Sequence, residues 1–238
     1  MSAQPMVTLM ELALRYQPAG RLVPVLAASD HVDASGLALR MGRFAASLGE
    51  TVLIIDDRGG EVMDRAGVVY GRTLADVVAG RCQLRDALYV TANEHFSMLA
   101  LNQRGFDELP LIEAVGTLAA LSLDFDWVFA VPPAGLRQPA ALLASGSDAC
   151  VLGFEADGTG PDRAFWMLDA IRSRNPRFDP FTLSFGPGDA VASALRLDTQ
   201  VRDHLGGTAR YSGHESDRDR VQTLLESMRR SCLRVAAA

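Results

Sequence analysis

The stretch LVPVLAASDHVDASGLALRMGRFAASLGETVLIIDD, residues 22–57, decides the fold of this chain. An apolar run at 23–28 leads into a polar loop at 29–33, and apolar residues at helical spacing follow. A second apolar run, 52–55, then ends in two aspartates. A buried strand, a crossover helix and a second buried strand predict a right-handed βαβ unit. Its first strand-to-helix loop is the usual place for phosphate, yet here the loop holds two aspartates, a histidine and no glycine.

Strands and helices alternate along the rest of the chain, which predicts an α/β fold with a doubly wound, mostly parallel sheet and helices on both faces, in three layers. Residues 1–20 are expected to form an N-terminal extension, and residues 21–238 a single domain. The expected strands are 22–28, 52–55, 96–101, 126–131, 149–154, 181–185 and 208–211. The expected helices are 34–48, 73–80, 84–88, 107–123, 138–145, 161–172, 190–205 and 217–235.

The charge composition excludes several functions. The chain has a formal net charge of -6, so nucleic acid is not an expected partner. It contains no lysine, and all 23 basic residues are arginine. Schiff-base enzymes, pyridoxal phosphate enzymes and the phosphate-binding lysine of a P-loop are therefore excluded.

Cysteine usage and the absence of a targeting pattern predict a cytoplasmic protein. The three cysteines lie far apart, without the spacing of a zinc site or of a disulfide framework. The first residues lack the basic and apolar regions of a signal peptide, and no apolar run reaches the length of about 18 residues that spans a membrane.

Four segments, in order, resemble a known family. They read SDHVDASG at 29–36, TLADVVAGRCQLRDAL at 73–88, FDWVFAVPPA at 125–134 and SDACVLGFE at 147–155. Their order and content are similar to those of the MinD/ParA group of P-loop ATPases over about residues 21–235. The resemblance implies the fold of that group.

The same alignment replaces most of the residues that carry chemistry in that group. The nucleotide loop of the family has two lysines and several glycines, and this chain has lost them. The acid that ends the third motif strand is also lost. Of the two acids in the DxD motif, one remains, as Asp56. Ser35 stands where the family has a magnesium-binding threonine. The degenerate loop consists of Ser29, Asp30, His31, Val32, Asp33, Ala34 and Ser35, and the degenerate Walker B position is Ala130.

These replacements predict a pseudo-ATPase with no cofactor. Phosphate binding needs positive charge or a nest of backbone N–H groups. Carboxylates beside the site oppose a triphosphate, by about 1 kcal/mol per close pair even in bulk water. Such a protein is expected to be no enzyme and to act through protein contacts.

The resemblance implies a role as a scaffold or regulator of a bacterial surface apparatus. Flagellar-number (FlhG-like), pilus-localisation (TadZ-like) and polysaccharide-export relatives are not separated by motifs in this chain. The expected partners are proteins of such an apparatus, in a homodimer or in a heterodimer with an active ATPase.

A rebuilt site is the alternative. Asp30, His31, Asp33 and Asp56 are expected at one sheet edge, and such side chains are suitable ligands for a divalent metal. The chain would then be a nucleotide- or metal-binding switch. A plainer interpretation is a solvated loop in which Asp33 caps the following helix.

The last helix, 217–235, has an apolar face with arginines beside it. MinD-like proteins often end in a helix that binds the membrane peripherally, at its inner face. The favoured interpretation is a closing helix packed on the sheet, because the face has no aromatic anchor. The residues singled out for a membrane or partner contact are Val221, Leu224, Leu225, Met228, Arg229 and Arg230.

Overall fold

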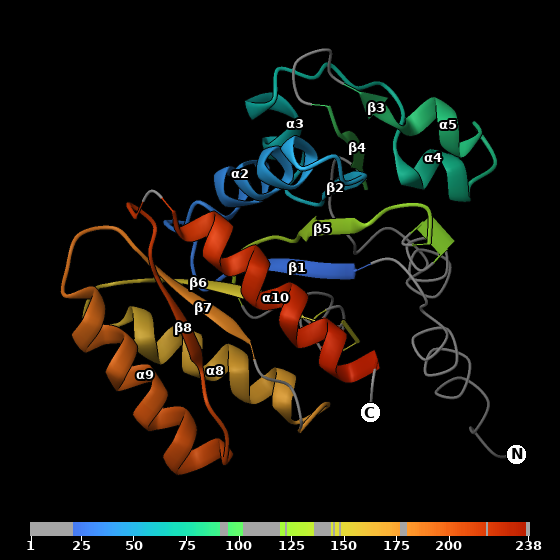
Figure 1. Cartoon of the computed structure of the whole chain (residues 1–238). Helices are drawn as coiled ribbons and strands as arrows, with labels where there is room; N and C mark the ends of the chain where they lie inside the picture. Colours follow the sequence, from blue (N-terminus) through green and yellow to red (C-terminus); the bar gives the residue numbers. More distant parts are fainter. Residues whose placement is uncertain are drawn as a thin grey trace, which may run out of the picture.

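The fold is an eight-stranded sheet with helices on both faces, among the residues that the structure describes (Figure 1). This computed structural model describes residues 21–90, 95–101, 120–121, 123–135, 144, 146–147, 149–176, 180–217 and 219–236. The strands are β1 (Arg21–Ala27), β2 (Val52–Asp56), β3 (Tyr89–Val90), β4 (Ser97–Ala100), β5 (Trp127–Val131), β6 (Val151–Glu155), β7 (Phe181–Phe185) and β8 (Arg210–His214). The helices are α2 (Ala34–Ser47), α3 (Glu61–Arg65), α4 (Leu74–Val78), α5 (Leu84–Ala87), α8 (Gly160–Arg172), α9 (Ala190–Leu205) and α10 (Arg220–Ala236).

The strand order is β3-β4-β2-β5-β1-β6-β7-β8, with β1 at the centre between β5 and β6. Every neighbouring pair is parallel except β3 and β4. The sheet extends from β1 in both directions, through β5 and β2 on one side and through β6 and β7 on the other. The predicted doubly wound, mostly parallel sheet is confirmed.

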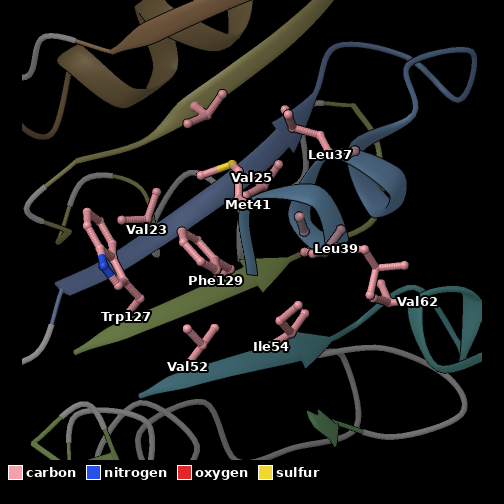
Figure 2. Packing of buried hydrophobic residues seen from close by; sticks show 14 of the residues in the cluster. Val23, Val25, Leu37, Leu39, Met41, Val52, Ile54, Val62, Trp127 and Phe129 are labelled. Atoms are coloured by element: carbon pink, nitrogen blue, oxygen red, sulfur yellow. The ribbon is translucent and has the colours of Figure 1, made fainter. Parts of the chain in front are cut away.

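Helix α2 packs on the central strands because its apolar residues recur on one face. Figure 2 shows Leu37 and Met41 of α2 against Val25 of β1 and Phe129 of β5. Each of these four side chains is at most 1% exposed. The Trp127 ring stacks on Phe129, with ring centroids 5.6 Å apart.

The opposite face of the sheet is covered by two groups of helices. Helices α8 and α9 bury a cluster with β6 that includes Leu152 and Phe154. Helices α4 and α5 bury a second cluster with β2, β4 and β5, which includes Leu53 and Val128. The chain therefore has helices above and below one sheet, as the alternating pattern predicts.

The C-terminal helix α10 lies on the same face of the sheet as α2 (Figure 1). Leu224, Leu225 and Met228 are 0% exposed and belong to the same cluster as the α2 core. Val221 is half-buried against that cluster. In this structure the apolar face of the helix is used inside the fold, and the three buried side chains are not presented to a membrane or a partner.

The last strand differs from the sequence-based prediction. It was expected at 208–211, but β8 runs from Arg210 to His214. The pairing of β7 with β8 shifts register between Thr182 and Leu183, so β8 contains a bulge that admits Gly213 at a φ of 121°. Gly213, a residue type that usually interrupts a strand, is therefore part of β8.

Other differences concern short elements and parts of the chain outside the described residues. The sequence patterns missed α3 and the antiparallel β3, and α10 begins at Arg220 and not at 217. The extension 1–20, nearly all of the expected helix 107–123 and most of the helix 138–145 lie outside the described residues. The division into an extension and one domain stays a prediction.

Candidate functional site

The loop that follows β1 lies at the carboxyl edge of the sheet, next to the ends of β2 and β5. The N–H of Gly135 donates to the carbonyl of Ala27 at 2.9 Å, and the N–H of Asp57 donates to the carbonyl of Val131 at 3.1 Å. These bonds join segments that follow parallel strands, so the loop and Asp56 lie at one edge, as expected.

Asp33 is the N-cap of α2. Its Oδ1 accepts a hydrogen bond from the Gly36 N–H at 2.9 Å. A Cβ on Gly36 would lie 2.2 Å from the Asp33 Oδ2, so glycine at this position lets the carboxylate close over the helix end. The plainer interpretation of Asp33 as a helix cap is confirmed.

Asp56, the retained acid, is used as a second helix cap. Its side chain is 0% exposed. Oδ1 accepts the Arg58 N–H at 2.8 Å, and Oδ2 accepts the N–H groups of Val62 at 2.9 Å and Met63 at 3.1 Å. Burial raises the pKa of Asp56 above its ordinary value, and hydrogen bonds from Met63, Arg58 and Val62 offset only part of that rise.

A chain of ion pairs connects the loop to α3. Arg58 approaches Asp30 at 4.0 Å and donates to Glu61 at 2.8 Å. Arg65 approaches Glu61 at 3.3 Å and Asp33 at 2.6 Å. We call these five residues the loop–α3 ion chain. It uses two guanidinium groups and three carboxylates, so its formal charge is negative.

Two polar atoms near this loop are buried and have no hydrogen-bond partner among the described residues: Ser35 Oγ and Arg58 Nη1. The Ser35 side chain is 0% exposed. Ala130, which the sequence resemblance aligns with the Walker B position, is 1% exposed and lies in the core cluster of α4 and α5. The position thus presents no carboxylate.

The four residues of the alternative metal site are only partly brought together. Asp33 and Asp56 are each bound to helix N–H groups, while Asp30 and His31 are exposed. Within the described ranges, no group of three or more His, Cys, Asp or Glu side chains is placed to hold a metal ion.

Sequence patterns missed two of the residues that build this edge, Glu61 and Arg65. Their helix α3 is only five residues long, and its N-cap Gly60 has a φ of 98°. The spacing of Glu61 and Arg65 at i and i+4 was the available signal, since such residues share one side of a helix.

The arginines of α10 have different surroundings. Arg229 pairs with Glu50 at the end of α2, and its guanidinium lies 5.9 Å from the Trp127 ring centroid. Trp127 Nε1 also donates to Glu50, at 3.0 Å. Arg230 is exposed. No helix within the described residues has the length and apolar character needed to cross a membrane.

Comparison with known proteins gives structural matches alone. No protein-family model matches the sequence, and no curated protein matches it. Several solved structures are similar, all with sequence identities that support the fold and nothing further.

The first of these is a plasmid partition protein from Borrelia burgdorferi, with a TM-score of 0.64 at 11% identity over 89% of this chain and 99% of that chain. The second is the MinC:MinD cell division protein complex of Aquifex aeolicus, with a TM-score of 0.60 at 15% identity over 92% and 96%. The third is the septum site-determining protein MinD of Pyrococcus horikoshii complexed with Mg-ADP, with a TM-score of 0.60 at 16% identity over 75% and 77%. The fold is therefore that of MinD/ParA-type P-loop ATPases.

Proposed function

We propose that this chain is a MinD/ParA-fold protein without ATPase activity, which acts through protein contacts as a scaffold or regulator of a bacterial surface apparatus for polysaccharide secretion, a flagellum or a pilus. The observation that carries the proposal is the loop–α3 ion chain together with the Asp56 cap. In them Asp33 and Asp56 bind helix N–H groups, and Arg58 and Arg65 pair with carboxylates of the protein itself.

The side chains around the loop after β1 do not fit a magnesium nucleotide. A triphosphate needs cations or bare N–H groups, whereas the loop presents Asp30, which is 90% exposed, and Asp33. Among the described residues, Arg58 and Arg65 are cations beside this loop, and each is paired with two carboxylates. Asp56 would have to release the N–H groups of Val62 and Met63 before it could serve a metal-bound water.

The partners are proposed to be proteins. One structure of similar fold is a MinC:MinD complex and another is a plasmid partition protein, so this fold supports protein assembly in other chains. By analogy we propose a homodimer, or a heterodimer with an active ATPase. A peripheral contact with the inner face of the membrane would have to use surface residues such as Arg230, because Leu224, Leu225 and Met228 are in the core.

Calorimetric titration with ATP–Mg, ADP and divalent metals tests the absence of a nucleotide switch. We expect no saturable binding by the wild type. Micromolar ATP binding that is lost in Ser35→Ala and kept in Ser47→Ala would overturn the proposal. Ser47 is the matched control because it is an exposed serine at the far end of the same helix.

Affinity capture from the native cell tests the protein-contact role. We expect the same partner to be recovered in equal amounts with ATP, with ADP and without nucleotide. Recovery only in the presence of ATP would contradict a constitutive role. The identity of the partner assigns the apparatus.

A second candidate is the ligand-binding switch with a rebuilt site. It is favoured by one observation, which is that Ser35 Oγ and Arg58 Nη1 are both buried without a partner among the described residues. Such atoms are the kind of group that a bound ligand satisfies. Saturable metal or nucleotide binding in the same titration, weakened by Ser35→Ala, would favour this candidate over the first.

A further inference from the structure

A pocket of about 380 Å³ lies between β8 and α10, away from the loop that follows β1. Its strand residues are at the amino ends of β7 and β8, since Phe181 pairs with Arg210 at the first position of both strands. The degenerate loop lies at the carboxyl ends of the parallel strands. The pocket is therefore a separate place in the fold. Figure 1 shows β8 at the sheet edge with α10 beside it.

The lining of this pocket is basic in a chain whose formal net charge is -6. It includes Arg210 from β8 and Arg220 and Arg230 from α10. Among the described residues that line it, none is an aspartate or a glutamate. Arginines that line one pocket favour an anion, and the planar forks of their guanidinium groups suit phosphate oxygens.

Arg220 is held in place before any ligand arrives. Its Nη2 donates to Asp217 at 2.5 Å. A Cβ on Gly213 would lie 2.1 Å from the Arg220 Cζ, so the guanidinium rests on a strand position that only glycine leaves open. Fixing the side chain in this way lowers the entropy that binding would otherwise cost.

Hydroxyl groups and two aromatic residues complete the pocket. Tyr211, Ser212, Thr223 and Ser227 line it. The hydroxyls of Ser212 and Thr223 already donate to the carbonyls of Arg210 and Asp219, and that of Tyr211 is hydrogen-bonded to Ser184, so their oxygens can accept from sugar hydroxyls. Ser227 Oγ accepts from Arg230, and its own O–H can donate to phosphate. Phe181 is 4% exposed and has the Arg210 guanidinium 5.6 Å from its ring centroid. The volume lies within the range of about 300–1,000 Å³ of small-molecule sites.

We propose that this pocket binds a phosphomonoester, carried either by a soluble small molecule such as a sugar phosphate or by a lipid headgroup. Arg210 and Arg230 supply positive charge, Arg220 supplies N–H groups beside its ion pair with Asp217, and the hydroxyl groups contact the neighbouring polar part of the ligand. The proposal does not depend on whether the loop after β1 binds nucleotide.

The test is titration of the full chain with glucose 6-phosphate, glucose and inorganic phosphate, monitored by calorimetry. We expect saturable binding of glucose 6-phosphate, weaker binding of phosphate and none of glucose. Removing one charge-assisted hydrogen bond in Arg230→Gln should weaken the affinity by about tenfold or more. Arg85→Gln, which changes an exposed arginine on α5, should leave the affinity unchanged.

Vesicles that contain phosphatidate, compared with neutral vesicles, form the second arm of the test. Cosedimentation with phosphatidate vesicles that Arg230→Gln weakens, without binding of glucose 6-phosphate, would assign the phosphomonoester to a lipid. The absence of binding in both arms would overturn the proposal. So would binding that Arg230→Gln and Arg210→Gln leave at the wild-type level while both variants keep the wild-type melting temperature.

Discussion

Replacing Asp56 by alanine should destabilise the protein in the absence of any nucleotide or metal. The carboxylate accepts three backbone N–H groups at 2.8–3.1 Å, two of which belong to the buried residues Val62 and Met63. A hydrogen bond to a charged group contributes about 1.5–3 kcal/mol, and a helix cap about 1 kcal/mol. Because the three bonds share one carboxylate, their effects do not add fully, and we expect a loss of about 3 kcal/mol.

Thermal and urea unfolding followed by circular dichroism measure this loss. In a chain of this size, 1 kcal/mol shifts the melting temperature by about 2–4 °C, so Asp56→Ala should melt about 6–12 °C lower. Asp56→Asn keeps one carbonyl acceptor and should lose less stability than Asp56→Ala. If the free energy of unfolding of Asp56→Ala lies within about 0.5 kcal/mol of the wild type, the capping role assigned to Asp56 is wrong.

The pH dependence of the same variant tests the environment of this carboxylate. Burial raises the pKa of Asp56 above its ordinary value, against hydrogen bonds from Met63, Arg58 and Val62 that lower it. The folded chain therefore holds this proton more tightly than the unfolded chain does. The resulting stabilisation is complete below the unfolded pKa and is lost as the pH rises through the raised value. Relative to Asp56→Asn, the wild type should lose stability as the pH rises above about 4, and a relative gain would contradict a raised pKa.

Three further perturbations have defined outcomes. Asp33→Ala should lower the free energy of unfolding by about 1 kcal/mol through loss of the α2 cap, while Asp30→Ala, at a 90% exposed side chain, should change it by less than about 0.5 kcal/mol in the same urea titration. Glu50→Ala should lower the free energy of unfolding by about 1–3 kcal/mol, because it removes the acceptor of Arg229 at a site where both side chains are less than one-quarter exposed. Arg229→Ala should lower it by a similar amount. A double mutant whose loss equals the sum of the two single losses would contradict a direct coupling. Cys150 should stay unmodified by iodoacetamide in the native protein and react after unfolding, as read by peptide mass spectrometry, because complete burial raises the pKa of its thiol; modification of the folded protein would contradict this.

The inner part of the sheet could be predicted from the sequence because strands such as β2 and β5 are buried on both faces. Runs such as 52–55 and 127–131 are fully buried in the structure, and continuous apolar runs between helical patterns are the signature of parallel strands. The cap at Asp33 was also predictable, because the side chain and its helix are neighbours in sequence.

The arrangement around Asp56 could not be predicted in the same way. It depends on α3, which is too short to have a detectable period, and on pairs such as Arg65 with Asp33 that are far apart in sequence. For α10 the favoured interpretation, a closing helix packed on the fold, is confirmed by the burial of Leu224, Leu225 and Met228. It depended on the lack of an aromatic anchor, because an amphipathic pattern alone does not say whether the apolar face packs on a membrane or inside the fold. The choice is made by tertiary contacts.

The contact of Glu50 with Arg229 has a consequence for how the protein is made. The two residues are 179 positions apart in sequence, and they join the segment between α2 and β2 to α10. Contacts of such long range form late, since the entropy of loop closure must be overcome first. During synthesis α2 therefore has its face toward α10 uncovered until the ribosome has passed Arg229, and a chaperone that binds apolar helices would find this surface open for most of that time.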